Sequence, residues 1–249
     1  MPSSICTLDR QLERQAGWLK NSWFWILNRT VLSDIPDGRS KPTALDVGCG
    51  PGIVMETFRN RLDVRGIDRD SDMVASCRTR GLEAQVSIAE KLPYKDGSFD
   101  LVYCSFLLLW VKDPAVVVKE MSRVSRRWVI CLAEPDFGGR LDYPDELSVL
   151  RSLIIKGIEE QGGDPCIGRK LRSLFSRNGL DSEIGIHQGI WGIDRLVAES
   201  DDEWTWLEMT VKPSARDGQL KDIRQAWRSA LVAGTLFQYN PTFYAIACK

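Results

Sequence analysis

Hydrophobic and polar residues alternate along the chain in a pattern that predicts short strands separated by helices. Four apolar runs predict strands, at residues 44–47, 64–67, 99–104 and 128–133. The last two runs are nearly continuous, as is typical of parallel strands that are buried on both faces. Helical spacing occurs at residues 53–61 and 72–80, and Asp113 before Pro114 marks the start of a third helix. This order predicts a doubly wound α/β sheet.

The two ends of the chain predict further helices around this core. At residues 8–31 apolar side chains recur every three or four positions, which predicts one or two helices before a loop at residues 36–42. Helical stripes also occur at residues 147–158, 168–177 and 220–231. Residues 200–203 (Ser-Asp-Asp-Glu) resemble a capping box that begins another helix. Two more strands are expected at residues 184–190 and 243–247.

These elements predict a single domain over residues 1–249. Its N-terminal helical cap is expected at residues 1–40, and its core at residues 42–191 and 234–249. A helical insertion at residues 192–233 is expected to precede the last strand.

Composition narrows the class of protein. Lys and Arg number 33 against 34 Asp and Glu, so the formal net charge is −1 and lacks the basic excess of a nucleic-acid binder. No apolar stretch approaches the ~20 residues that span a bilayer, and the N-terminus has no signal-peptide core. The seven cysteines form no CxxC pair. We therefore expect reduced core cysteines, no metal site and a cytoplasmic location.

A glycine-rich loop at residues 45–52 (Leu-Asp-Val-Gly-Cys-Gly-Pro-Gly) lies between a predicted strand and a predicted helix. Glycines let the backbone pass close to a ligand, and the helix start offers free N–H groups. The spacing is G-x-G-x-G, and Ile53 stands where dinucleotide enzymes have their third glycine. Asp46 ends the first strand and can receive an ammonium group. Asp68 ends the next strand and can accept both hydroxyls of a ribose.

Together these motifs resemble the class I S-adenosylmethionine-dependent methyltransferases. Residues 45–52 resemble their motif I, and residues 66–68 (Gly-Ile-Asp) resemble the acidic end of their second strand. Residues 89–94 and 96–100 resemble the adenine-side loop and fourth strand of the methyltransferase-11 group, which includes quinone-biosynthesis enzymes. The resemblance implies a Rossmann-like, mostly parallel sheet of seven strands and S-adenosyl-L-methionine as cofactor.

The same resemblance assigns roles to individual residues. Asp68 would hold the ribose, Arg69 and Met73 would flank the adenine, and Ser105 would lie beside the methionine part. The predicted cofactor-binding residues are Asp46, Gly48, Gly50, Gly52, Asp68, Arg69, Met73, Ile88, Ala89, Glu90 and Ser105. The chain departs from the group at Ile88, where an acidic or amide residue is frequent, and at Leu109, where the group often has a histidine. A base at the second position is therefore absent.

Candidate catalytic groups are few. Glu134 and Asp136 follow the strand at residues 128–133, at the sheet edge where ligands of open α/β proteins bind, so either carboxylate could orient or deprotonate an acceptor. Tyr143 is a weaker candidate. His187 is the only histidine and would be a general base if it faced the cleft, although an edge-strand or surface position is the ordinary alternative.

Nine tryptophans are many for a chain of this length. Trp18, Trp23 and Trp25 lie in the N-terminal helical region, and Trp191, Trp204 and Trp206 surround the insertion. Most are expected to pack between helices and sheet. Where the two caps meet over the cofactor, however, aromatic faces would form an acceptor pocket.

Methyl transfer to a small molecule is the leading functional hypothesis, because near-neutral charge and helical caps favour an enclosed pocket. A protein side-chain methyltransferase would need an open cleft, and a nucleic-acid methyltransferase a basic face. A cofactor-binding subunit without chemistry is a fourth alternative. The loop spacing argues against an NAD-dependent dehydrogenase.

Overall fold

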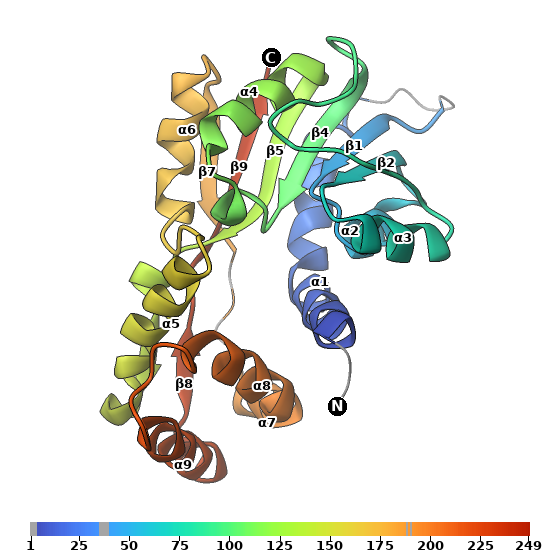
Figure 1. The fold of residues 1–249 in the computed structure, drawn as a ribbon. Helices are drawn as coiled ribbons and strands as arrows, with labels where there is room; N and C mark the ends of the chain where they lie inside the picture. The colour runs from blue at the N-terminus through green and yellow to red at the C-terminus, as the bar shows by residue number, and fades with distance from the viewer. Residues whose placement is uncertain (1–3, 35–39, 188, 190) are drawn as a thin grey trace.

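The computed structural model describes residues 4–34, 40–187, 189 and 191–249, with side chains from residue 9 onward. Seven strands form one sheet in the order β3-β2-β1-β4-β5-β9-β7 (Figure 1). Their bounds are β1 Thr43–Val47, β2 Asp63–Asp68, β3 Glu83–Val86, β4 Phe99–Ser105, β5 Ser125–Pro135, β7 Ser182–Ile186 and β9 Thr242–Cys248. β9 is antiparallel to both of its neighbours, β5 and β7, whereas the other neighbouring strands of this sheet pair in parallel. The predicted mostly parallel, doubly wound sheet is confirmed.

Helices cover both faces of the sheet because the strands alternate their side chains between two cores. The helices that flank the sheet are α1 Ser4–Asn28, α2 Ile53–Phe58, α3 Ser71–Thr79, α4 Pro114–Val124 and α6 Leu171–Arg177. Leu101 and Tyr103 of β4 pack in the cluster formed by α1 and α2. Val102 and Cys104 pack in the opposite cluster, formed by α4 and α6. This period of two is what a strand buried on both faces requires.

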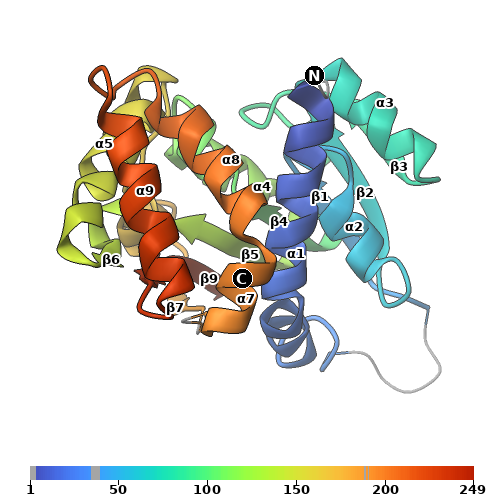
Figure 2. The same ribbon diagram turned by 90° about the horizontal axis from the view of Figure 1, so that it is seen from below.

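A third group of elements, here called the cap layer, lies beyond the carboxyl ends of the central strands. It contains α5 Val149–Glu160, α7 Ile193–Ala198, α8 Ser200–Val211 and α9 Gln219–Val232, with the short antiparallel pair β6 Leu141–Tyr143 and β8 Phe237–Tyr239. These helices have their own apolar cluster. Seen from below, α1 runs alongside α8 (Figure 2), so the N-terminal helix flanks both the sheet and the cap layer.

Some local predictions were incomplete or wrong. Strands β3, β6 and β8 and helix α7 were not predicted. Residues 200–203 do not form a capping box, because α8 follows directly on α7 and Glu199 stands at its N-cap without a side-chain bond. By contrast, Asp113 caps α4 as predicted, accepting the amides of Ala115 and Val116.

Several predicted features lie outside the described residues: most of the loop at 36–42, Ile190, and the side chains of Leu8 and Cys6. Within the described part of the chain, no helix is long and apolar enough to cross a membrane. The six cysteines whose side chains are described are all free thiols.

Candidate functional site

The glycine loop after β1 folds as a tight cradle. Gly48, Gly50 and Gly52 have φ values of 74°, 51° and 88°, in the left-handed region that glycine adopts without a Cβ clash. The amides of Gly48 and Cys49 donate to the carbonyl of Ile67 at 2.8 and 2.9 Å. The loop is therefore tied to the end of β2.

Asp68 joins this loop to the start of α3. Its Oδ2 accepts a hydrogen bond from the Gly50 amide at 2.8 Å, and its Oδ1 accepts one from the Asp70 amide at 2.9 Å. Asp70 in turn caps α3 by accepting the amides of Asp72 and Met73. Because each carboxylate oxygen has two lone pairs, Asp68 keeps acceptor capacity for a ligand.

A cavity of about 320 Å³, here called the smaller cavity, lies over this loop. Nine of the eleven predicted cofactor-binding residues line it: Asp46, Gly48, Gly50, Asp68, Arg69, Met73, Ala89, Glu90 and Ser105. Gly52 and Ile88 lie outside its lining. A Cβ on Gly52 would sit 2.7 Å from Cys77 Sγ and Leu82 Cδ1, so this glycine serves helix packing. The Ile88 side chain is 52% exposed and turns to solvent.

Two polar atoms in the smaller cavity lack partners. Asp46 Oδ2 and Ser105 Oγ are buried and form no hydrogen bond of ordinary geometry with the described residues, and the Tyr103 hydroxyl is a neighbouring donor to the Asp46 carboxyl. Burial raises the pKa of the Asp46 carboxyl well above its usual range. Buried polar groups are normally satisfied, so these two atoms fit a ligand that brings hydrogen-bond donors, such as an ammonium group.

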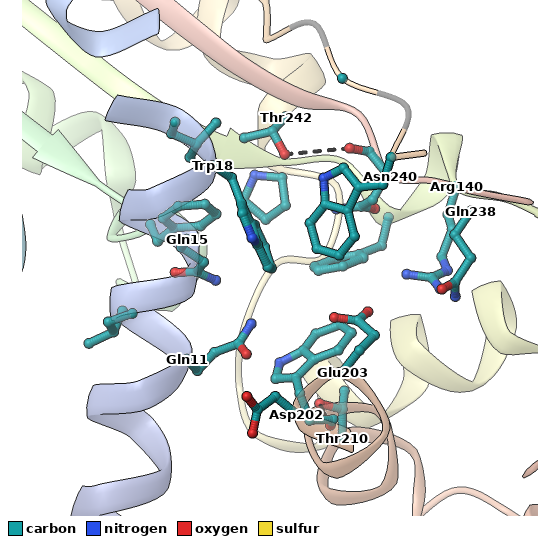
Figure 3. A pocket seen from close by; sticks show the side chains of 18 of the residues that line it. Gln11, Gln15, Trp18, Arg140, Asp202, Glu203, Thr210, Gln238, Asn240 and Thr242 are labelled. Carbon is teal, nitrogen blue, oxygen red and sulfur yellow. Dashed lines mark hydrogen bonds between the residues drawn. The ribbon is translucent and has the colours of Figure 1, made fainter. Parts of the chain in front are cut away.

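A cavity of about 690 Å³, the larger cavity, lies between α1 and the cap layer. Figure 3 shows Gln11, Gln15 and Trp18 entering from α1, and Asp202, Glu203 and Thr210 from α8. Arg140 and Gln238 lie at the end opposite α1 (Figure 3). Four residues line both cavities: Leu12, Gln15, Phe106 and Trp110. The two cavities are therefore adjacent.

Of the α1 residues that line the larger cavity, Trp18 was named among the aromatic residues of an acceptor pocket, whereas Gln11 and Gln15 were not predicted. Gln11, Gln15 and Trp18 follow the helical spacing i, i+4, i+7. They form a stripe beside the buried apolar stripe of the same helix. The two glutamines, one turn apart on a helix whose neighbouring face is apolar, were the sequence signal that could have indicated a cavity here.

Glu134 binds three backbone amides and does not line either cavity. Its side chain is fully buried, and its carboxylate accepts the amides of Leu107 at 2.9 Å, Leu108 at 2.6 Å and Leu109 at 3.3 Å. Burial raises the pKa of Glu134 to about 8. Because its oxygens are engaged with three amides, Glu134 holds the turn after β4 and does not reach an acceptor.

This turn carries a strained residue at the boundary of the two cavities. Phe106 has φ of 53°, and in the described part of the chain it is the one non-glycine residue with positive φ. Its amide donates to the Ala133 carbonyl at 2.8 Å. The hydrogen bonds to Glu134 and Ala133 thus fix the chain where Phe106 lines both cavities.

Glu134 also has ligand-type atoms nearby. Cys104 Sγ, Cys131 Sγ and a Glu134 oxygen all lie within 4.8 Å of one another, and the three residues are buried. The carboxylate already accepts hydrogen bonds from three amides, and burial raises the pKa of the Cys131 thiol well above its usual range. The donor set therefore does not fit a metal ion.

His187 lines the larger cavity and is buried, not exposed. Its Nε2 lies 2.6 Å from the Leu132 carbonyl, which can only accept, so Nε2 carries the proton. Its Nδ1 lies 2.7 Å from Ser22 Oγ and accepts the hydroxyl proton. Burial lowers the pKa of His187. Both ring nitrogens are engaged, which argues against a general-base role.

The remaining catalytic candidates lie away from both cavities. Asp136 accepts the Gly138 amide and pairs with Arg169 at 2.7 Å. Tyr143 is 54% exposed on β6. Neither residue is in the lining of the two cavities, so the structure does not bring them to the reacting position.

The tryptophans divide between packing and the cavities. Trp18, Trp191 and Trp206 line the larger cavity, and Trp23 reaches the smaller one. Trp204 lies in the apolar cluster of the cap layer, whereas Trp25 is 49% exposed.

Comparison with known proteins bears on the glycine loop and the strands around it. Residues 45–132 match the sequence profile of the family described as a methyltransferase domain. The matched segment contains the glycine loop, Asp68 and the Ala89-Glu90 pair, so over this segment the chain is similar to methyltransferase domains. A ubiquinone biosynthesis O-methyltransferase from Pseudomonas paraeruginosa is 37% identical over 98 residues, which cover 35% of this chain and 41% of the relative.

Two further comparisons cover more of the chain. An uncharacterized 37.1 kDa protein of a Streptomyces fradiae transposon is 29% identical over 233 residues, 88% of this chain and 66% of that protein. The chain thus spans less than two thirds of these curated relatives. A phosphoethanolamine N-methyltransferase 2 from Haemonchus contortus, solved with S-adenosyl-L-methionine, has the same fold at a TM-score of 0.56 and 15% identity; the match covers 90% of this chain and 52% of that one.

Proposed function

We propose that this protein transfers a methyl group from S-adenosyl-L-methionine to a small-molecule acceptor. The smaller cavity would hold the donor and the larger cavity the acceptor. One observation carries the proposal: Leu12, Gln15, Phe106 and Trp110 line both cavities, so ligands in the two would meet at this boundary. Such contact is what an in-line displacement needs.

The residues of the smaller cavity support the donor assignment. Asp46 Oδ2 is a buried acceptor without a partner and would receive the ammonium group of the donor. Asp68 has acceptor capacity for ribose hydroxyls, and the left-handed glycines keep Cβ atoms out of the cradle. Gly52 and Ile88 would contribute through the backbone or through packing only.

When bound, S-adenosyl-L-methionine supplies a methyl group on a positively charged sulfur, so the acceptor's lone pair takes the methyl carbon while the C–S bonding pair returns to sulfur. The protein's part is alignment and exclusion of water. Phe106, in the turn that Glu134 holds, lines both cavities at the boundary where the two ligands would meet. Gln15 Oε1 is buried without a described partner and would accept a hydrogen bond from the acceptor's O–H or N–H. The acceptor's proton would leave to solvent.

Ion pairs between α1 and the start of α8, beside the larger cavity, favour a small acceptor over a protein or nucleic-acid chain. Arg14 of α1 bonds Glu199 and Glu203 at 3.1 Å each, and Arg10 pairs with Asp202 at 3.1 Å. These contacts tie α1 to the start of α8 beside the larger cavity. Free thiols in the described residues are consistent with a reducing, cytoplasmic setting.

The direct test is methyl transfer from methyl-labelled S-adenosyl-L-methionine to three separate pools: a small-molecule extract, a protein fraction and purified RNA. Label in the small-molecule pool is expected. Label that enters protein or RNA alone would contradict the choice of acceptor while leaving the donor assignment intact. The heat-inactivated protein provides the background.

A further inference from the structure

We infer that the acceptor is an uncharged, elongated, largely aromatic molecule, with a hydrogen-bonding group at the end remote from the methyl donor. This inference rests on the proposed function, because it describes the occupant of the larger cavity. At about 690 Å³ that cavity has the size of sites for drug-sized ligands.

The charges in the cavity wall are already neutralised. Five charged residues line it in the described part of the chain: Arg10, Arg140, Arg195, Asp202 and Glu203. Each has a partner of opposite charge within 3.1 Å, and Arg10 and Asp202 pair with each other. The Arg140–Asp142 pair is almost fully buried, with side-chain exposures of 3% and 1%. A charged acceptor would lose its hydration without gaining a free counter-charge.

The aromatic walls favour a flat apolar body. Among the described residues, six Trp and Phe rings line the larger cavity, those of Trp18, Phe106, Trp110, Phe137, Trp191 and Trp206. Phe137 and Trp206 stack with centroids 5.9 Å apart, and Trp18 meets Trp191 edge-on at 4.2 Å. Rings of this kind offset-stack on planar ligands and bury large apolar areas.

Aromatic walls can also attract cations, but two of these rings are already occupied. The Arg195 guanidinium lies 4.7 Å from the Trp191 ring centroid and 5.6 Å from that of Trp18. Arg14 lies 5.0 Å from the Trp18 centroid. A cationic acceptor would compete with these guanidinium groups and be repelled by them.

Two side-chain oxygens that could accept a hydrogen bond lie at separate points of the wall of the larger cavity. Gln15 Oε1, at the boundary with the smaller cavity, and Asn240 Oδ1 are both buried without a partner among the described residues. In Figure 3 these two side chains come from different walls, Gln15 from α1 and Asn240 from the segment that leads into β9. The unsatisfied oxygen of Asn240 indicates a hydrogen-bonding substituent away from the reacting end.

Three biphenyls of matched shape test the charge preference. The probes are 4-hydroxy-4′-(hydroxymethyl)biphenyl, which is neutral, the 4′-carboxylate analogue, which is anionic, and the 4′-aminomethyl analogue, which is cationic. Each is titrated calorimetrically into the protein saturated with S-adenosylhomocysteine, so that no turnover occurs. The neutral probe is expected to bind about tenfold more tightly, or better, than either charged probe.

Two variants sharpen the test. Asn240→Leu should weaken the neutral probe about tenfold, as expected for one buried hydrogen bond, whereas Asn60→Leu, at an exposed position outside both cavities, should not. Asp142→Asn removes the counter-charge of Arg140 while keeping its shape. This variant should shift the preference toward the carboxylate probe by about tenfold. Circular dichroism checks that each variant folds.

The outcomes distinguish a failure of the inference on the acceptor from a failure of the proposed function. If S-adenosylhomocysteine binds and a charged probe binds as tightly as the neutral one, the inference on the acceptor is wrong and the proposed function stands. If S-adenosylhomocysteine itself does not bind the folded protein, the proposed function fails. Should Asp142→Asn not fold, the comparison of the three probes on the unaltered protein still decides.

Discussion

Glu134 Oε1 accepts the Leu108 amide at 2.6 Å, and this bond connects the end of β5 to the turn after β4. The same carboxylate holds the amides of Leu107 and Leu109. The pKa of Glu134 is raised to about 8 by burial, so the folded protein retains a proton that the unfolded chain loses near pH 4.5. Its contribution to stability is therefore full below pH 4.5 and is lost as the pH rises toward 8.

Glu134→Gln should remove this dependence. The amide keeps an oxygen for Leu107 and Leu108 but cannot ionise. The variant's free energy of unfolding should therefore rise relative to wild type by several kcal/mol between pH 5 and pH 9, since each unit of pKa shift corresponds to about 1.4 kcal/mol. Urea denaturation at pH 5, 7 and 9 measures it. Parallel pH profiles for the two proteins would contradict the raised pKa.

Gly48→Ala should damage the smaller cavity more than the fold. A Cβ at Gly48 would lie 2.6 Å from Leu107 Cδ1, so the Leu107 side chain must move within the cavity that it lines. Affinity for S-adenosyl-L-methionine should fall about tenfold or more. Gly81→Ala is the matched control, because Gly81 has nearly the same φ, 73°, with no atom within 4 Å of its Cβ position. Both variants should lose roughly 1 kcal/mol of stability. Equal donor affinities would show that contact with Leu107 is unimportant.

Arg14→Met should loosen the contact between α1 and α8. The Arg14 side chain is only 9% exposed and pairs with Glu199 and Glu203. The substitution therefore removes a cation from two partly buried carboxylates. The expected loss of stability is about 2 kcal/mol, with faster amide exchange in α8. Arg29→Met, in the turn directly after α1, is the control, because Arg29 pairs with Glu183 at exposures of 40% and 45%. That exposed pair should contribute at most about 1 kcal/mol. A smaller effect at Arg14 than at Arg29 would refute the proposed tie.

His187 should titrate below the ordinary histidine pKa of about 6.5. Burial lowers the pKa of this group, so its contribution to stability is present above pH 6.5 and is lost as the pH falls. Because the chain has a single histidine, nitrogen-15 NMR of the tag-free protein reports it without assignment. The spectrum should show the proton on Nε2 at pH 7. A proton on Nδ1, or a pKa above 7, would reopen the case for His187 as a base.

The sequence predicts the smaller cavity well because its residues are close together along the chain. The glycine loop, Asp68 and the Ala89-Glu90 pair all lie within residues 45–90, at the carboxyl ends of strands that β-strand patterning identifies. Strand β3 was not predicted because it is short and buries only Ala84, so it has no apolar run. The tight pairing of β1 with β2 and β4 then brings these local motifs together.

The larger cavity could not be predicted in the same way. It is formed by segments from α1, the stretch after β5, α8 and the approach to β9, and its cross-links join residues far apart in sequence, such as Arg14 and Glu203. Glu134 near the end of β5 and Asp136 directly after it have the expected position, yet their side chains are turned to backbone amides and to Arg169. Which way a carboxylate faces depends on tertiary contacts, and no local pattern encodes it.

Calorimetric titration of the unaltered protein, Asp68→Ala and Asp72→Ala with S-adenosyl-L-methionine tests whether the smaller cavity binds the methyl donor. Asp68 lines the smaller cavity and binds Gly50, whereas Asp72 is an exposed residue in the first turn of α3. We predict micromolar binding that Asp68→Ala abolishes and Asp72→Ala leaves unchanged. No binding to the folded protein, or equal binding by all three, would contradict the account.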